Sequence, residues 1–104
     1  MKLSTTDEIA GEEIAETLGL VRGNTIRARH LGRDFMAGLR NLVGGEIKDY
    51  TEMLSEARDE AIKRLIEEAE GLDADAVVEL RFTTSQTMGG AAEILAYGTA
   101  VKFK

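Results

Sequence analysis

The amino-acid sequence predicts an α+β domain in which helix covers one side of a sheet. Three observations lead to this class. The chain has 104 residues, which fits one domain, residues 1–104, and leaves no room for a second. One long segment repeats its apolar residues at helical spacing, and the last third of the chain alternates apolar and polar residues as strands do. We therefore expect a single domain with a helical layer and a sheet.

The first strand is expected over residues 14–28, which are rich in Ile, Val, Leu and Thr. Gly19 and Gly23 interrupt this segment, so it is either one strand with a bulge or two strands joined by a tight turn at Gly23-Asn24. A short helix is expected over residues 31–43, where apolar residues recur every three or four positions. Gly44-Gly45 is expected to end that helix.

The clearest element is a helix from Glu46 to Glu70. Its apolar residues form one stripe, which a sheet must cover, and most charged residues lie elsewhere. The stripe consists of Tyr50, Met53, Leu54, Ala57, Ala61, Leu65, Ile66 and Ala69. Gly71 is expected at the position just after the helix.

A β-hairpin is expected at the C-terminal end, with strands at 76–88 and 91–103 and a turn at Gly89-Gly90. In the first strand Ala76, Val78, Leu80 and Phe82 are predicted to share one face. The last strand is apolar on both faces, and one helical layer covers only one of them. A second subunit is therefore expected on the other face, unless its small residues are simply tolerated in water.

Composition and charge exclude several classes of function. The chain has no cysteine and one histidine, so it has no thiolate ligand, no disulfide and no imidazole-rich centre, and no cofactor is expected. The net charge is −6, and the basic stretch at 22–48 precedes a strongly acidic one at 49–75, so nucleic acid is not expected as a partner. No window of about eighteen apolar residues predicts a membrane span, and no apolar leader follows Met1. We expect a cytoplasmic protein without a membrane partner.

Few residues are candidates for a functional site. Arg29, His30 and Arg33 could line a pocket for a small anion between subunits, because guanidinium groups make forked contacts with carboxylates and phosphates. Arg33, Asp34 and Arg40 are the candidates for contacts with a neighbouring subunit or a small ligand. Each has a plainer alternative: the arginines could be solvated and pair with acids of the next segment or of a neighbouring subunit, His30 is a lone histidine beside bases, and Asp34 suits the first turn of a helix.

Other chemistry finds little support. Asp73 and Asp75 flank Ala74 in a loop and are the candidates for a hard-cation site, although no further ligands accompany them. Glycine-rich phosphate loops and a nucleophile elbow are missing from the sequence. No catalytic residue is assigned, and an enzyme is expected only if a site is shared between chains.

Several blocks of residues, in order along nearly the whole chain, resemble the YbjQ-like family of small prokaryotic proteins. The blocks are Ser4-Thr5-Thr6, Gly19-x-Val21-x-Gly23, Arg33-Asp34-Phe35-x-Ala37-Gly38-x-Arg40, Val43-Gly44-Gly45, Tyr50, Ala57-Arg58, Ala74-Asp75-Ala76-Val77-Val78 and Gly98-Thr99-Ala100-Val101-Lys102. The resemblance implies a two-layer β-α-β-β subunit with an antiparallel sheet, similar to a dodecin subunit. It also implies assembly into a homopentamer, with short strands that aid the subunit contacts.

The chain departs from the family pattern at two points. The family carries a heavy-metal-binding label, whereas this sequence has no cysteine and one histidine. The family's usual Leu-Gly-Ala-Asp-Ala turn has Asp73 in place of its glycine, so the left-handed residue is expected elsewhere, at Gly71. We expect a non-enzymatic homo-oligomer; the alternatives are a protein that binds a small molecule or anion between subunits, and a hard-metal binder.

Overall fold

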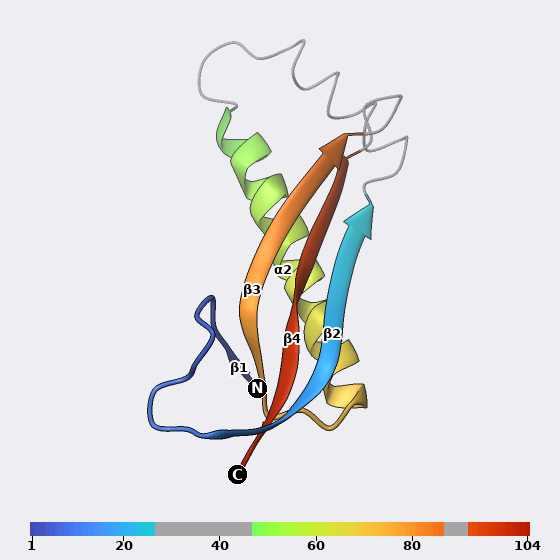
Figure 1. Cartoon of the computed structure of the whole chain (residues 1–104). Helices are drawn as coiled ribbons and strands as arrows, with labels where there is room; N and C mark the ends of the chain where they lie inside the picture. Colours follow the sequence, from blue (N-terminus) through green and yellow to red (C-terminus); the bar gives the residue numbers. More distant parts are fainter. Residues whose placement is uncertain (27–46, 87–91) are drawn as a thin grey trace.

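The structure is a computed structural model that describes residues 1–26, 47–86 and 92–104 (Figure 1). Its elements are β1 (Lys2–Leu3), β2 (Ile14–Ile26), α2 (Ile47–Gly71), β3 (Ala76–Gln86) and β4 (Ala92–Phe103). The strands form one sheet in the order β1-β3-β4-β2, and α2 packs on one face of it. The predicted α+β class with two layers is confirmed. The helix expected at 31–43 and the glycine pairs 44–45 and 89–90 lie outside the described residues.

The sheet is mixed, which corrects the prediction of an antiparallel sheet. β4 pairs antiparallel with both β2 and β3, but β1 pairs parallel with β3, with Lys2 opposite Ala76 and Leu3 opposite Val77. A strand of two residues is too short to show a period-2 pattern. Its pairing is therefore visible only in three dimensions.

β2 is one continuous strand, so the alternative of a turn at Gly23-Asn24 is wrong and the bulged strand is correct. The register with β4 shifts between Ile14 and Glu16 and again between Thr17 and Gly19. Gly19 has φ +127 at the second shift, a backbone conformation that favours glycine. Gly23 serves close packing instead: a Cβ there would collide with the backbone of α2 at Ala61 and Leu65.

The alternation of β3 breaks at a bulge, which corrects the predicted face. The register with β4 shifts between Val78 and Arg81, and Glu79 has φ 53. Val77 and Leu80 consequently both join the core under the helix, while Val78 lies on the opposite face. The extra residue of a bulge reverses the side on which later residues point, and periodicity alone does not reveal it.

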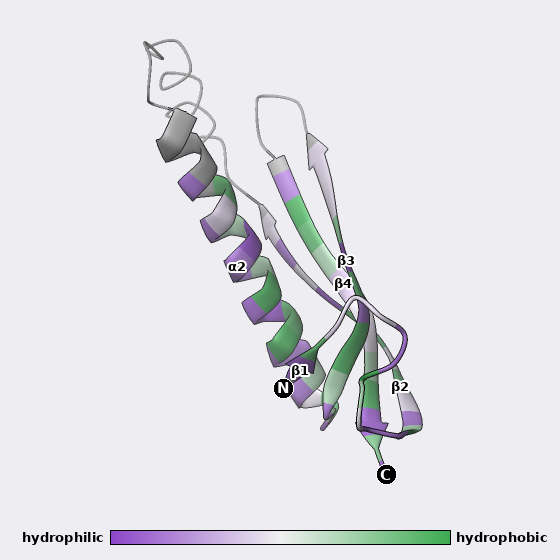
Figure 2. Cartoon of the chain, turned by 90° about the vertical axis from the view of Figure 1, so that its left-hand side faces the viewer, coloured by the Kyte–Doolittle hydropathy of each residue, from purple (hydrophilic) through white to green (hydrophobic). Residues whose placement is uncertain are grey.

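The main core lies between α2 and the sheet and is built largely from small side chains. Ala57, Ala61, Leu65 and Ala69 of the predicted stripe are buried there, which confirms the long helix. Figure 2 shows the apolar side of α2 turned toward the strands. Alanine and glycine at the contact allow the helix to lie directly on β2 and β4.

Candidate functional site

The face of the sheet turned away from α2, here called the outer face, is covered at one end by the chain's own N-terminal segment. Three buried residues, Ala76, Val78 and Val101, form a second apolar cluster there, with Ile9, Ile14 and Phe103 packed against it. The N-terminal segment is fixed to the edge of β3. Ser4 N–H donates to the Val77 carbonyl at 3.0 Å, and Leu80 N–H donates to the Ser4 carbonyl at 3.0 Å.

The other part of the outer face lacks such a cover among the described residues. We call it the upper outer face and define it by Leu20, Arg22, Arg81, Leu95 and Tyr97. Leu20 is 66% exposed and Tyr97 is 36% exposed, while Leu95 is half-buried. These residues come from three adjacent strands, so they form one continuous surface.

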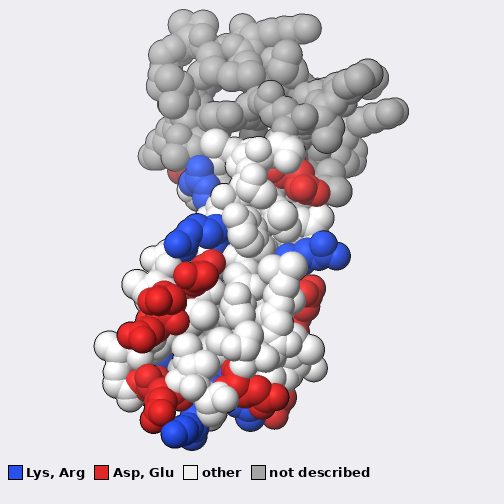
Figure 3. Space-filling view, in the orientation of Figure 1, with Lys and Arg blue, Asp and Glu red and all other residues white. Residues whose placement is uncertain are grey.

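Two arginines flank the tyrosine in a row across the strands. In the sheet register Arg22 of β2 and Arg81 of β3 both pair with Tyr97 of β4. Paired residues of antiparallel strands point to the same side of a sheet, so all three project from the outer face. Figure 3 views this face and shows Lys and Arg side chains on both sides of an uncharged strip.

Among the described residues, both guanidinium groups keep hydrogens for an anionic partner. Arg81 Nη1 donates to the carbonyls of Thr5 at 2.8 Å and Leu80 at 2.9 Å, which leaves its Nε and Nη2 hydrogens for other acceptors. Within the described ranges no carboxylate forms an ion pair with Arg22 or Arg81. The acid that lies further along this face, Glu93, accepts a hydrogen bond from Asn24 Nδ2 at 3.4 Å.

Side chains of α2 satisfy backbone groups along the free edge of β2. Glu68 Oε1 accepts a hydrogen bond from Arg22 N–H at 3.3 Å, and Arg64 Nη1 donates to the Asn24 carbonyl at 2.6 Å. Thr25 Oγ1, which is buried, donates to the Ala57 carbonyl at 2.9 Å. This part of the edge is therefore partly blocked against pairing with another strand.

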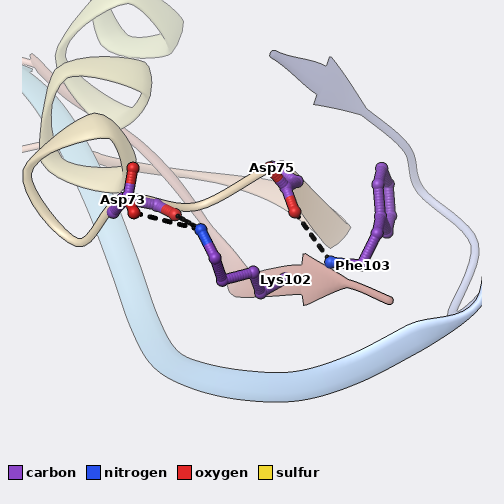
Figure 4. Close-up of polar contacts among 4 residues, drawn as sticks. All are labelled: Asp73, Asp75, Lys102 and Phe103. Carbon is purple, nitrogen blue, oxygen red and sulfur yellow. Dashed lines mark hydrogen bonds and ion pairs between the residues drawn. The ribbon is translucent and has the colours of Figure 1, made fainter.

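The candidate cation ligands Asp73 and Asp75 already have partners within the chain (Figure 4). Lys102 Nζ donates to Asp73 Oδ2 at 3.1 Å and to the Asp73 carbonyl at 2.8 Å. The hydrogen bond to Asp73 is the main cause that raises the pKa of Lys102 above its ordinary value. Asp75 Oδ2 accepts from Phe103 N–H at 2.8 Å. In the part of the chain that the structure describes, no group of three or more His, Cys, Asp or Glu side chains could hold a metal ion.

Asp73 also occupies the left-handed position at the end of α2, so the assignment of that position to Gly71 is wrong. Asp73 has φ 60, whereas Gly71 belongs to the helix and has no positive φ. Asp73 N–H donates to the Glu70 carbonyl at 2.9 Å and Ala74 N–H donates to the Ala69 carbonyl at 3.1 Å. These two bonds form a Schellman motif with Asp73 at the position where glycine is usual.

The remaining predicted site residues, Arg29, His30, Arg33, Asp34 and Arg40, lie outside the described residues. Their roles stay predictions. Sequence reasoning missed the row of Arg22, Tyr97 and Arg81, because these residues meet only through the strand order and the β3 bulge. Their position in period-2 segments was the available signal, but it does not specify which strands are neighbours.

The comparisons with known proteins match this chain over all or nearly all of its length. A family model named YbjQ_1 and described as "Putative heavy-metal-binding" matches residues 1–104. The chain is 62% identical over 104 residues to a UPF0145 protein of Halorubrum lacusprofundi, with all of both chains covered. It is 63% identical over 102 residues to a UPF0145 protein of Methanosarcina acetivorans, covering 98% of this chain and 96% of that one.

A solved structure shares the fold. It is the crystal structure of a protein of unknown function from Pediococcus pentosaceus, described as a member of the DUF74 family. The TM-score is 0.66 at 21% sequence identity, covering 100% of this chain and 98% of that chain. None of the described helices is long and apolar enough to cross a membrane.

Proposed function

Because the chain belongs to the YbjQ family over its whole length, we propose that it is a non-enzymatic protein that works as a homo-oligomer. Copies of the chain cover one another's upper outer face. The proposal takes its subunit number, five, from the family resemblance.

The exposure of apolar side chains on the upper outer face carries the proposal. Leu20 is two-thirds exposed and lies on the same face as the buried Val78 and Val101. Covering one leucine side chain stabilises an assembly by about 1.5–3 kcal/mol, and Tyr97 and Leu95 add to the same patch. An apolar patch beside residues of the buried cluster is typical of an interaction surface.

The two arginines favour a ring over a simple dimer. In a two-fold contact made by this patch alone, Arg22 and Arg81 of one copy would face Arg22 and Arg81 of the other. Like charges placed together at an interface are unfavourable. A head-to-tail contact avoids this, and such contacts close into a ring when the rotation permits.

The residues of this chain do not fit the heavy metal in the family description. Soft and borderline metals prefer thiolate and imidazole ligands, and the chain has no cysteine and one histidine. The proposal therefore includes no step that depends on a metal. The alternatives of a small-anion site at Arg29, His30 and Arg33, and of a hard-cation site at Asp73 and Asp75, stay predictions.

The test is the subunit number of the untreated protein and of one variant, measured by native mass spectrometry and light scattering at micromolar concentration. We expect a pentamer for the wild type and a monomer for Leu20→Asp, because the substitution replaces the most exposed apolar side chain of the patch with a charged one, which is costly to remove from water. Leu72→Asp is the matched control, since Leu72 is 44% exposed but lies outside the upper outer face. A monomeric wild type, or a Leu20→Asp variant that assembles normally, would refute the proposal.

A further inference from the structure

We propose that Arg22 and Arg81 on the upper outer face bind carboxylates on the outward side of α2 in the neighbouring copy. This inference rests on the proposed assembly and identifies the surface that completes it. It commits to a second copy of this chain as the partner.

The charges of the two surfaces are complementary. The arginine row projects from the outer face of a chain whose net charge is −6. On the other side of the molecule, the side chains of α2 that lie opposite its buried stripe and that the structure describes are exposed and mostly acidic. This outward stripe consists of Glu52, Glu56, Asp59, Lys63, Glu67 and Glu70. Five acids and one base leave it negative, so each copy has a basic patch on its sheet and an acidic surface on its helix.

The spacing of the charges also matches. Arg22 and Arg81 stand on either side of one strand, so their backbones are two strand spacings apart, about 10 Å. Glu52 and Asp59 are seven residues apart, which on a helix corresponds to about 10 Å along the axis and nearly the same direction. The row runs across the strands, so a helix that satisfies both arginines must cross them as well.

Such a contact joins the outer face of one copy to the helix of the next. In an open row of copies, the first and last copies therefore each keep one unused surface. The contact is therefore heterologous, and heterologous contacts close into a ring when the rotation between neighbouring copies permits. The same contact gives each arginine a charged acceptor, and charge-assisted pairs are the stronger class of hydrogen bond. It also places the neighbour's helix over Leu20 and Tyr97, the residues that carry the proposed assembly.

A charge-exchange experiment tests the pairing. The first variant is Arg22→Glu with Arg81→Glu, and the second is Glu52→Lys with Asp59→Lys. We expect each to weaken subunit association roughly a hundredfold, because both surfaces of a contact then carry the same charge. A mixture of the two variants is expected to recover association between unlike copies, detected as mixed oligomers, since each supplies the surface that the other lacks. A ring of five cannot alternate the two variants throughout, so it keeps at least one like-charged contact.

The control is Lys2→Glu with Lys104→Glu, which changes the net charge by the same amount as the arginine variant but alters the far end of the molecule. Circular dichroism and thermal unfolding are the checks that each variant folds. The single variant Arg22→Glu is a further check, because it keeps the hydrogen bond from Arg81 to the Thr5 carbonyl. Assembly is measured by native mass spectrometry at low ionic strength, where charge pairs are least screened.

The outcomes separate this inference from the proposed function. If both charge variants assemble like the wild type while Leu20→Asp is monomeric, the proposed function stands and this pairing is wrong. Variants that dissociate but do not recover on mixing would also overturn it, because the partner of the arginines would then be another segment or a bound anion. Recovery on mixing, with an unaffected control, supports it.

Discussion

The two faces of the sheet are made by the same three long strands, yet they are covered in different ways. The helix-facing side meets α2 through Ala57, Ala61 and Leu65. On the outer side the N-terminal segment covers Val78 and Val101, whereas Leu20 stays exposed to solvent. Within the described residues, one face of the sheet is therefore covered by a packed helix and the other is covered only in part.

The side chains of the two faces also differ in kind. The helix-facing side has mostly small residues, which allow the backbones of α2 and the sheet to approach closely. The upper outer face instead has leucine, tyrosine and arginine, of which tyrosine and arginine are enriched where proteins bind each other. The helix-covered face and the proposed assembly surface therefore differ in composition within one sheet.

The largest effect is expected on the helix-facing side. Leu65 is fully buried there, and Leu65→Ala should lower the free energy of unfolding by about 2–5 kcal/mol, because it leaves a cavity between α2 and the sheet. Urea unfolding measures the loss. Leu72→Ala, the same change at a half-exposed position, is the control and should cost much less. A loss below about 1 kcal/mol for Leu65→Ala would mean that this face is not tightly packed.

A second substitution on the same side adds atoms instead of removing them. Gly23→Ala should lower the free energy of unfolding by about 1–3 kcal/mol, because the new Cβ collides with the backbone of α2 and the helix must shift. Gly71→Ala is the matched control: its Cβ would meet open space, so it should be neutral or slightly stabilising. Equal effects at the two glycines in urea unfolding would contradict the close approach of helix and sheet.

How far the sequence could predict these faces depended on the length of each pattern. The helix of 25 residues and the two long C-terminal strands follow from periodicity, because many residues repeat one signal. The bulge at Glu79 and the two-residue β1 involve too few residues to alter a pattern, although they decide which residues share a face. The arginine row of the candidate site depends on both strand order and that bulge, so it could not be predicted without the structure.

The smallest effect concerns Asp73, where the chain passes from the helical layer to the sheet. Asp73→Gly should raise the free energy of unfolding by about 0.5–1 kcal/mol, because glycine adopts the left-handed conformation at little cost.

The stability gained by Asp73→Gly over the wild type should increase at alkaline pH. Asp73 raises the pKa of Lys102 above its ordinary value of 10.5, so their interaction stabilises the wild type below that pH and is lost as pH rises through the folded-state pKa. Urea unfolding from about pH 8 to about pH 12 measures both parts. Asp73→Asn separates them, because asparagine tolerates the left-handed conformation but carries no charge. A destabilised Asp73→Gly variant would show that the side chain of Asp73 stabilises the turn by more than its backbone conformation costs.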